Sequence, residues 1–142
     1  MKFLMPALAT LGLLSACSGG AAPSEANAEY SAAPLLDLKS DTGLDVEVRT
    51  LPLQPPALGT SSVELTITDT ATELPESGLD IKTVPWMPAM GHGTSVTPTV
   101  AETAPGVYEI SGVVLFMPGT WELRTTLSGS VTDQVVPTFQ IH

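Results

Sequence analysis

Residues 87–93, with the sequence MPAMGHG, place two methionines and a histidine within one short segment directly after Trp86. Thioether sulfurs are soft, neutral donors that suit Cu(I) and are poor ligands for Zn²⁺, Ca²⁺ or Mg²⁺, while imidazole accepts copper in either oxidation state. Pro88 restricts the backbone between the methionines, and the glycines flanking His92 leave its ring free to turn. The segment therefore predicts part of a Met/His copper site.

A third methionine, Met117, stands in the segment FMPG at residues 116–119, just before Trp121. Loops that leave one end of a β-sandwich can meet at that end, so this methionine is expected to complete a site of three or four ligands. The candidate ligands for Cu(I) are Met87, Met90, His92 and Met117. Trp86 is expected to cover them as a shield or cation–π contact.

Two other interpretations of these residues remain open. Methionine is a common filler of gaps in protein cores, and a tryptophan beside a methionine near the end of a sheet is typical of packing. The same loop would also serve as an exposed Trp/Met contact patch for another protein of the cell envelope, with no metal involved.

Catalytic motifs are missing from the sequence. There is no nucleophile elbow with a Ser/His/acid set, no cysteine beside a histidine, no glycine-rich phosphate loop and no HExxH. The chain has two histidines, His92 and the terminal His142, and no pair of carboxylates stands out by its surroundings. We therefore expect that the protein is not an enzyme.

The first residues predict export and lipid anchoring. Lys2 precedes an apolar run, residues 3–16, that is too short for a stop-transfer helix, so residues 1–16 are interpreted as a signal peptide. The tetrapeptide LSAC at 14–17 resembles the bacterial lipobox, which makes Cys17 the expected lipidation site, carrying palmitate and anchoring the protein to a membrane. Ser18 after this cysteine suggests the periplasmic face of the outer membrane if the source is Gram-negative.

Residues 17–34 are small and mostly polar, so they are expected to form a flexible tether rather than part of a core. The remaining residues, 35–142, suffice for one compact domain. With Cys17 as the only cysteine of the chain, this domain is expected to contain no disulfide.

Alternation of apolar and polar residues with period two recurs after residue 35, and no apolar pattern has helical spacing. About seven short strands separated by turn signals predict an all-β domain, a single immunoglobulin-like β-sandwich. The expected strands cover 44–48, 63–67, 79–83, 94–101, 107–116, 121–127 and 134–141.

Two of these strands carry specific expectations. In the strand 107–116, Tyr108, Ile110, Gly112 and Val114 are expected to share one face because they alternate along the chain. Trp121 is expected to fill the space between the sheets that a cystine occupies in many such domains.

The sequence carries a net charge of −10 at pH 7. Such a charge disfavours binding to nucleic acid and to anionic lipid surfaces, and favours a cation or a basic partner. No nucleic-acid partner is therefore expected.

The order of MPAMGHG, Pro98, PGVY at 105–108 and FMPGTWEL at 116–123 resembles the YtkA-like and FixH-like domains of exported bacterial proteins. The resemblance covers roughly Leu44 to Ile141. It implies a small β-sandwich in the cell envelope that is tied to copper handling or to the assembly of copper-containing oxidases, with such a protein as partner. By this resemblance Met87, Met90, His92 and Met117 match the candidate ligands of the family.

Overall fold

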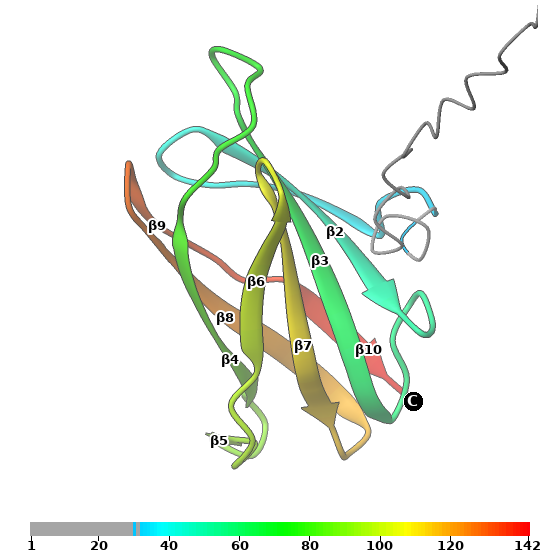
Figure 1. The fold of residues 1–142 in the computed structure, drawn as a ribbon. Coiled ribbons are helices and arrows are strands. Elements are labelled where there is room, and N and C mark those ends of the chain that lie inside the picture. Colours follow the sequence, from blue (N-terminus) through cyan, green and yellow to red (C-terminus); the bar gives the residue numbers. More distant parts are fainter. Residues whose placement is uncertain (1–29, 31) are drawn as a thin grey trace, which may run out of the picture.

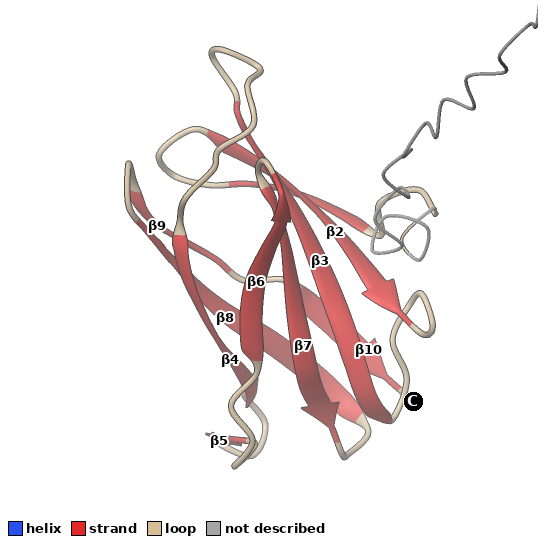
Figure 2. Ribbon diagram, viewed as in Figure 1, coloured by secondary structure: helices blue, strands red, loops and turns tan. Residues whose placement is uncertain are grey.

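The computed structural model describes residue 30 and residues 32–142 of the chain (Figure 1). The expected signal peptide, the expected lipidation site Cys17 and most of the expected tether lie outside this part. Within it the secondary structure consists of strands joined by loops and turns, as Figure 2 shows. Among these residues no helix is long and apolar enough to cross a membrane.

Ten strands in the described part form two antiparallel sheets that face each other. The first sheet has the order β1-β2-β3-β7-β6, and the second has the order β10-β8-β4-β5, with β9 paired to the second half of β8. The bounds are β1 Leu36–Lys39, β2 Leu44–Leu51, β3 Gly59–Asp69, β4 Asp80–Met87, β5 His92–Gly93, β6 Thr99–Ala104, β7 Val107–Leu115, β8 Gly119–Ser128, β9 Thr132–Val135 and β10 Thr138–Ile141. The expected all-β, immunoglobulin-like sandwich without a disulfide is confirmed.

The core lies between the two sheets because each long strand turns alternate apolar residues inward. In β2, for example, Leu44, Val46 and Val48 are buried while the residues between them are only partly covered. Trp121 of β8 is fully buried, as its expected core role requires. The core contains Leu44, Val46, Val48, Val63, Leu65, Ile67, Leu79, Ile81, Met87, Tyr108, Ile110, Val113, Leu115, Trp121, Leu123, Leu127, Val135, Phe139 and Ile141.

The strand 107–116 does not keep one face along its whole length, so that expectation is wrong. Tyr108 and Ile110 are buried, but beyond Gly112 the buried residues are Val113 and Leu115. The pairing with β3 shifts at this point, which is the register change of a β-bulge, and Gly112 has a φ of 77°. The extra residue of the bulge reverses the alternation for the rest of β7. Leu115, which regular alternation would place on the outer face, therefore points into the core.

The strands that the alternation pattern missed are short. β1 and β9 contain four residues each and β5 contains two, too few for a period-two pattern to stand out. Pro137 separates β9 from β10, because proline cannot donate to the ladder. The strand expected at 94–101 begins only at Thr99, since residues 94–98 carry the chain from one sheet to the other.

Residues just before β1, which were expected to belong to the tether, lie against the first sheet. Tyr30 is buried, and the carbonyl oxygens of Ala32 and Ala33 accept hydrogen bonds from Arg49 (3.0 Å) and Gln54 (2.6 Å). The chain therefore joins the sandwich beside the end of β2.

Candidate metal site

The segment 87–93 forms a tight hairpin between β4 and β5. The amide nitrogens of Met90 and Gly91 donate to the carbonyl oxygen of Met87, at 3.1 and 3.0 Å, which closes the turn. Gly91 has a φ of 68°, a conformation that side chains disfavour, so the glycine before His92 is required by the turn. The chain thus reverses between Met87 and His92.

This reversal pairs Met87 directly with His92 across the two strands. Residues directly opposite in an antiparallel ladder project to the same face of the sheet. Met87 is buried at the end of the core, whereas His92 and Met90 are exposed. The hairpin therefore offers one buried thioether and, beside it, an imidazole and a second thioether that are open to solvent.

The turn between β7 and β8 contacts the β4–β5 hairpin. The ring of Phe116 stacks on the ring of His92, with centroids 6.4 Å apart and planes at 8°. Phe116 also meets the buried ring of Trp121 edge-on at 5.3 Å. His92 is therefore held in an aromatic row that begins in the core.

Met117 follows Phe116 in the same turn and is partly buried against the core. Its carbonyl oxygen accepts a hydrogen bond of 2.9 Å from the indole nitrogen of Trp121, which fixes the backbone of the turn. Two residues further on, a β-carbon placed on Gly119 would lie 2.5 Å from the methyl carbon of Met87. The structure thus brings Met87, His92 and the turn that carries Met117 into contact, and Met90 lies in the adjoining hairpin turn.

The tautomer of His92 follows from its hydrogen bond. Its Nδ1 lies 3.1 Å from the carbonyl oxygen of Gly93, and a carbonyl can only accept, so Nδ1 carries the proton. In the neutral ring Nε2 then keeps its lone pair, and the neutral imidazole is the form in which histidine binds a metal.

Trp86 faces away from this cluster. It alternates with Met87 along β4, so it projects to the outer face of the second sheet. The guanidinium of Arg124 lies 4.6 Å above its ring, and Arg124 in turn donates to Glu122 at 3.0 Å. A cation–π contact is therefore present with Arg124, and this placement does not favour a role of Trp86 as a cover over the ligands.

Sites for hard cations are not found in the described part of the chain. No group of three or more His, Cys, Asp or Glu residues there is arranged to hold a metal ion. The donors that do gather, thioethers with one imidazole, fit a soft monovalent ion such as Cu(I).

One buried carboxylate, Glu64, lies elsewhere, on the outer face of the first sheet. Burial raises the pKa of Glu64, and the carboxylates of Glu109 and Glu47 add to the rise, while the opposing charge of Arg49 lowers it. Arg49 lies 3.6 Å from Glu64 and 2.8 Å from Glu47. This group is an ion-pair cluster that holds β2 to β3, with no nucleophile or imidazole among its members.

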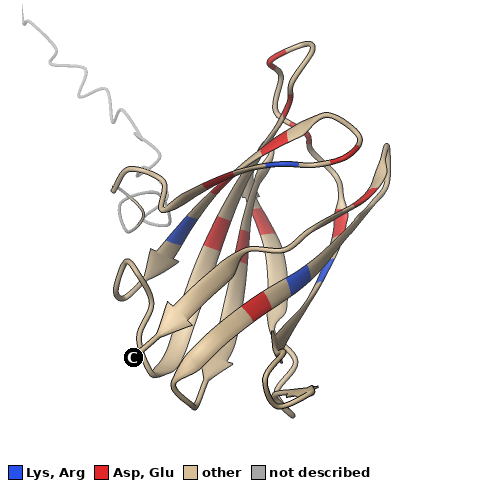
Figure 3. Ribbon diagram, turned by 180° about the vertical axis from the view of Figure 1, so that it is seen from behind, with Lys and Arg blue, Asp and Glu red and all other residues tan. Residues whose placement is uncertain are grey.

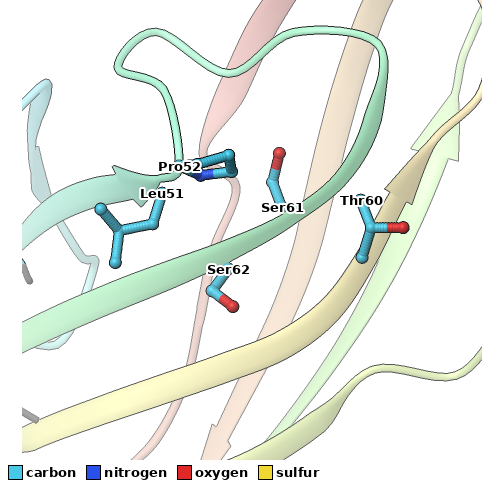
Figure 4. A pocket seen from close by; sticks show the side chains of 5 residues that line it. All are labelled: Leu51, Pro52, Thr60, Ser61 and Ser62. Carbon is cyan, nitrogen blue, oxygen red and sulfur yellow. The ribbon is translucent and has the colours of Figure 1, made fainter.

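A hollow of about 430 Å³ lies between the end of β2 and the start of β3, lined by Leu51, Pro52, Thr60, Ser61 and Ser62 (Figure 4). Figure 4 shows Ser61 and Ser62 on opposite sides of the strand, as alternation requires. The lining offers hydroxyl groups and aliphatic carbon but no carboxylate, imidazole, thiol or amine. We therefore assign no chemistry to this hollow.

Two residues of the site were missed by sequence reasoning. Phe116 precedes Met117 and Gly119 follows two residues later in FMPG, but residue type alone predicts only the methionine as a ligand. The signal was present in the segment itself, because an aromatic residue and a glycine on either side of a candidate ligand mark a ring contact and a close backbone approach.

The fold and this cluster define a class: a small two-sheet β-sandwich that carries candidate soft ligands in the loops of one end. Residues 39–126 of the 142 match the YtkA-like family, and the chain belongs to that family. A crystal structure of a DUF4426 family protein from Pseudomonas aeruginosa is similar, with a TM-score of 0.51 and 9% identity over 75% of this chain and 96% of that one. At this identity the likeness concerns the fold alone. No curated protein matches this sequence.

Proposed function

We propose that this YtkA-like protein is a Cu(I)-binding carrier of the cell envelope, anchored by lipid on Cys17, that delivers copper to a copper-handling protein or oxidase. The observation that carries the proposal is the pairing of Met87 with His92 at the point where the turn bearing Met117 arrives. These three residues are the proposed ligands, with Met90 as a fourth from the hairpin turn.

The difference in burial among the donors supports a carrier rather than a permanent store. Met87 is 4% exposed, whereas Met90 is 52% exposed and His92 is open to solvent as well. An acceptor can therefore approach the exposed donors while the buried thioether holds the ion, so that ligands are exchanged one at a time. Nothing in this arrangement calls for catalysis, and we propose none.

The test is an anaerobic Cu(I) titration against a colorimetric chelator, with one ion per chain expected. Met87→Leu and Met117→Leu keep the side-chain volume but remove the donor, so each should weaken affinity by about tenfold or more. The double variant Met90→Leu/His92→Gln should lose the site. Leu74→Met, which adds an exposed thioether elsewhere, is the matched control and should leave the stoichiometry at one.

Uptake by the wild-type chain that does not exceed uptake by a variant without Met87, Met90 and Met117 would overturn the copper proposal. The remaining candidate would then be a protein-interaction module that uses the same loop. In that case Trp86→Ala should abolish capture of the partner.

A further inference from the structure

Charged residues are missing from one end of the sandwich. The segments 50–63, 83–101, 110–121 and 134–142 contain no Asp, Glu, Lys or Arg, although the chain has a net charge of −10. Figure 3 shows the acidic and basic residues of the described part on the faces and at the opposite end, with none on the turns near β5 and the end of β10. The fold brings these uncharged segments of the sequence together at one end.

The strand pairing gathers these segments at one end. Gly59 pairs with Leu115, which places the loop 52–58 beside the turn 116–118. Ile141 pairs with Gly119, so β10 finishes at the same end, and the β4–β5 hairpin reaches it through the contact of His92 with Phe116. Thr99 pairs with Ser111, so the connection 94–98 also lies at this end. We call this set of loops the uncharged end.

The uncharged end is also where large apolar side chains are exposed. Of the seven such residues in the described part, five belong to it; the other two, Leu74 and Val84, lie on the opposite connection and on the outer face of β4. The five are Leu53 (57% exposed), Leu58 (49%), Met90 (52%), Val96 (47%) and Phe116 (46%). A hollow of about 430 Å³, lined in part by Val96, Val114 and Phe116, separates two of these loops.

The chain that precedes the domain arrives at this end. Ala33 is bound by Gln54, a residue of the loop 52–58, so the described chain begins beside the exposed Leu53. Upstream, 29 residues precede Tyr30, and among them residues 3–16 form the apolar run of the sequence. Any attachment of the upstream residues to a membrane would therefore act on the domain from beside the loop 52–58.

From this combination we infer that the uncharged end is a surface that rests on a zwitterionic lipid bilayer. Transfer of exposed Leu, Val, Met and Phe side chains from water to lipid lowers the free energy. The acidic residues stay in water at the other end, so the charge distribution orients the molecule on the membrane. The charge also sets the lipid preference, because zwitterionic headgroups accept the uncharged end whereas anionic headgroups repel the negatively charged protein. The inference does not depend on copper; a copper acceptor would reach Met90 and His92 only while this end is away from the bilayer.

The experiment measures the depth of a nitroxide label on the full-length chain, in which Cys17→Ser makes the introduced thiol the only one. Labels are attached after Leu53→Cys or Val96→Cys at the uncharged end, and after Leu74→Cys as the matched control, since all three positions are exposed. Phosphatidylcholine vesicles are added until every variant co-floats with the vesicles in a density gradient. Binding through any part of the chain meets this condition. Near-UV circular dichroism checks that each variant is folded.

Labels at Leu53 and Val96 should collide with dissolved oxygen several-fold more often, relative to a water-soluble nickel complex, than the label at Leu74. Mixing phosphatidylglycerol into the vesicles should reduce this difference, and added salt should restore it, because the repulsion is screened. Equal water accessibility at all three positions, or a contact that anionic lipid strengthens, would overturn the inference. Equal water accessibility would favour a protein, and not a lipid surface, as the partner of the uncharged end.

Discussion

The methyl carbon of Met87 lies against the backbone of Gly119, so close that a β-carbon on Gly119 would fall 2.5 Å from it. This contact joins the β4–β5 hairpin to the start of β8, directly after the turn that carries Met117. The position of the buried thioether therefore depends on a residue that has no side chain.

Gly119→Ala should displace Met87 and weaken Cu(I) affinity by about tenfold or more, because the new methyl group occupies the space of the thioether. The backbone at Gly119 has a φ of 130°, so the substitution also strains the chain. Gly59→Ala is the control, with a φ of 124° at the same end and nothing within 4 Å of the added carbon. Chelator titration of both variants separates the effects; equal losses would mean that strain, and not the contact with Met87, is responsible.

Replacing Phe116 tests whether its ring positions His92. Phe116→Leu removes the stack on His92 and should lower Cu(I) affinity by up to about tenfold, since aromatic pairs are worth about 0.5–1.5 kcal/mol. Phe116→Tyr keeps a ring of the same shape and should restore affinity. If the leucine variant binds as tightly as the wild type, the stacked ring does not position the ligand.

Trp121→Ala should lower the free energy of unfolding by about 3–5 kcal/mol in denaturant melts, because a fully buried indole leaves a large cavity. Trp86→Ala is the matched control: this half-buried indole lies on the outer face under Arg124, so a loss of about 1 kcal/mol or less is expected. A loss below about 1 kcal/mol for Trp121→Ala would contradict its role in the core.

Asp133 lies at the end of the sandwich opposite the candidate metal site, where β9 meets the connection between β1 and β2. Its carboxylate predicts a dependence of stability on pH. Burial alone would raise the pKa of Asp133, but hydrogen bonds from Ser40, Thr42 and Gln134 outweigh it and lower the pKa from 3.8 to about 2. The carboxylate therefore stabilises the fold above about pH 4, and this contribution is lost as the pH falls through about 2.

Asp133→Asn should accordingly reduce stability by about 1 kcal/mol at pH 7, after allowance for solvent screening, and by little at pH 2. Thermal melts of both proteins across this range measure the difference. Asp37→Asn, which removes an exposed carboxylate of β1, is the control for the loss of one surface charge. A deficit that stays constant down to pH 2 would contradict the assignment.

Much of the architecture follows from the sequence because the residues that a strand buries are set by the alternation of apolar and polar residues along that strand. Alternating residues in 44–48, 63–67 and 121–127 predict the strands and their inward faces, since side chains along a strand point to opposite sides in turn. The same local signal fails where the backbone departs from regular pleating. At Gly112 the bulge exchanges the two faces, so Val113 and Leu115 are buried in place of Gly112 and Val114.

For the candidate site, the sequence by itself determined the kind of donors and their grouping in two short segments, because soft ligands are recognisable by residue type. Whether these segments meet is a non-local property, decided by strand pairing and sheet order. Only the tertiary structure placed Met87 opposite His92, set Phe116 on the imidazole, turned Trp86 to the outer face and collected the uncharged segments at one end. The physical reason is that periodicity fixes which way a side chain points along one strand, whereas contacts between loops depend on how distant strands pair and pack.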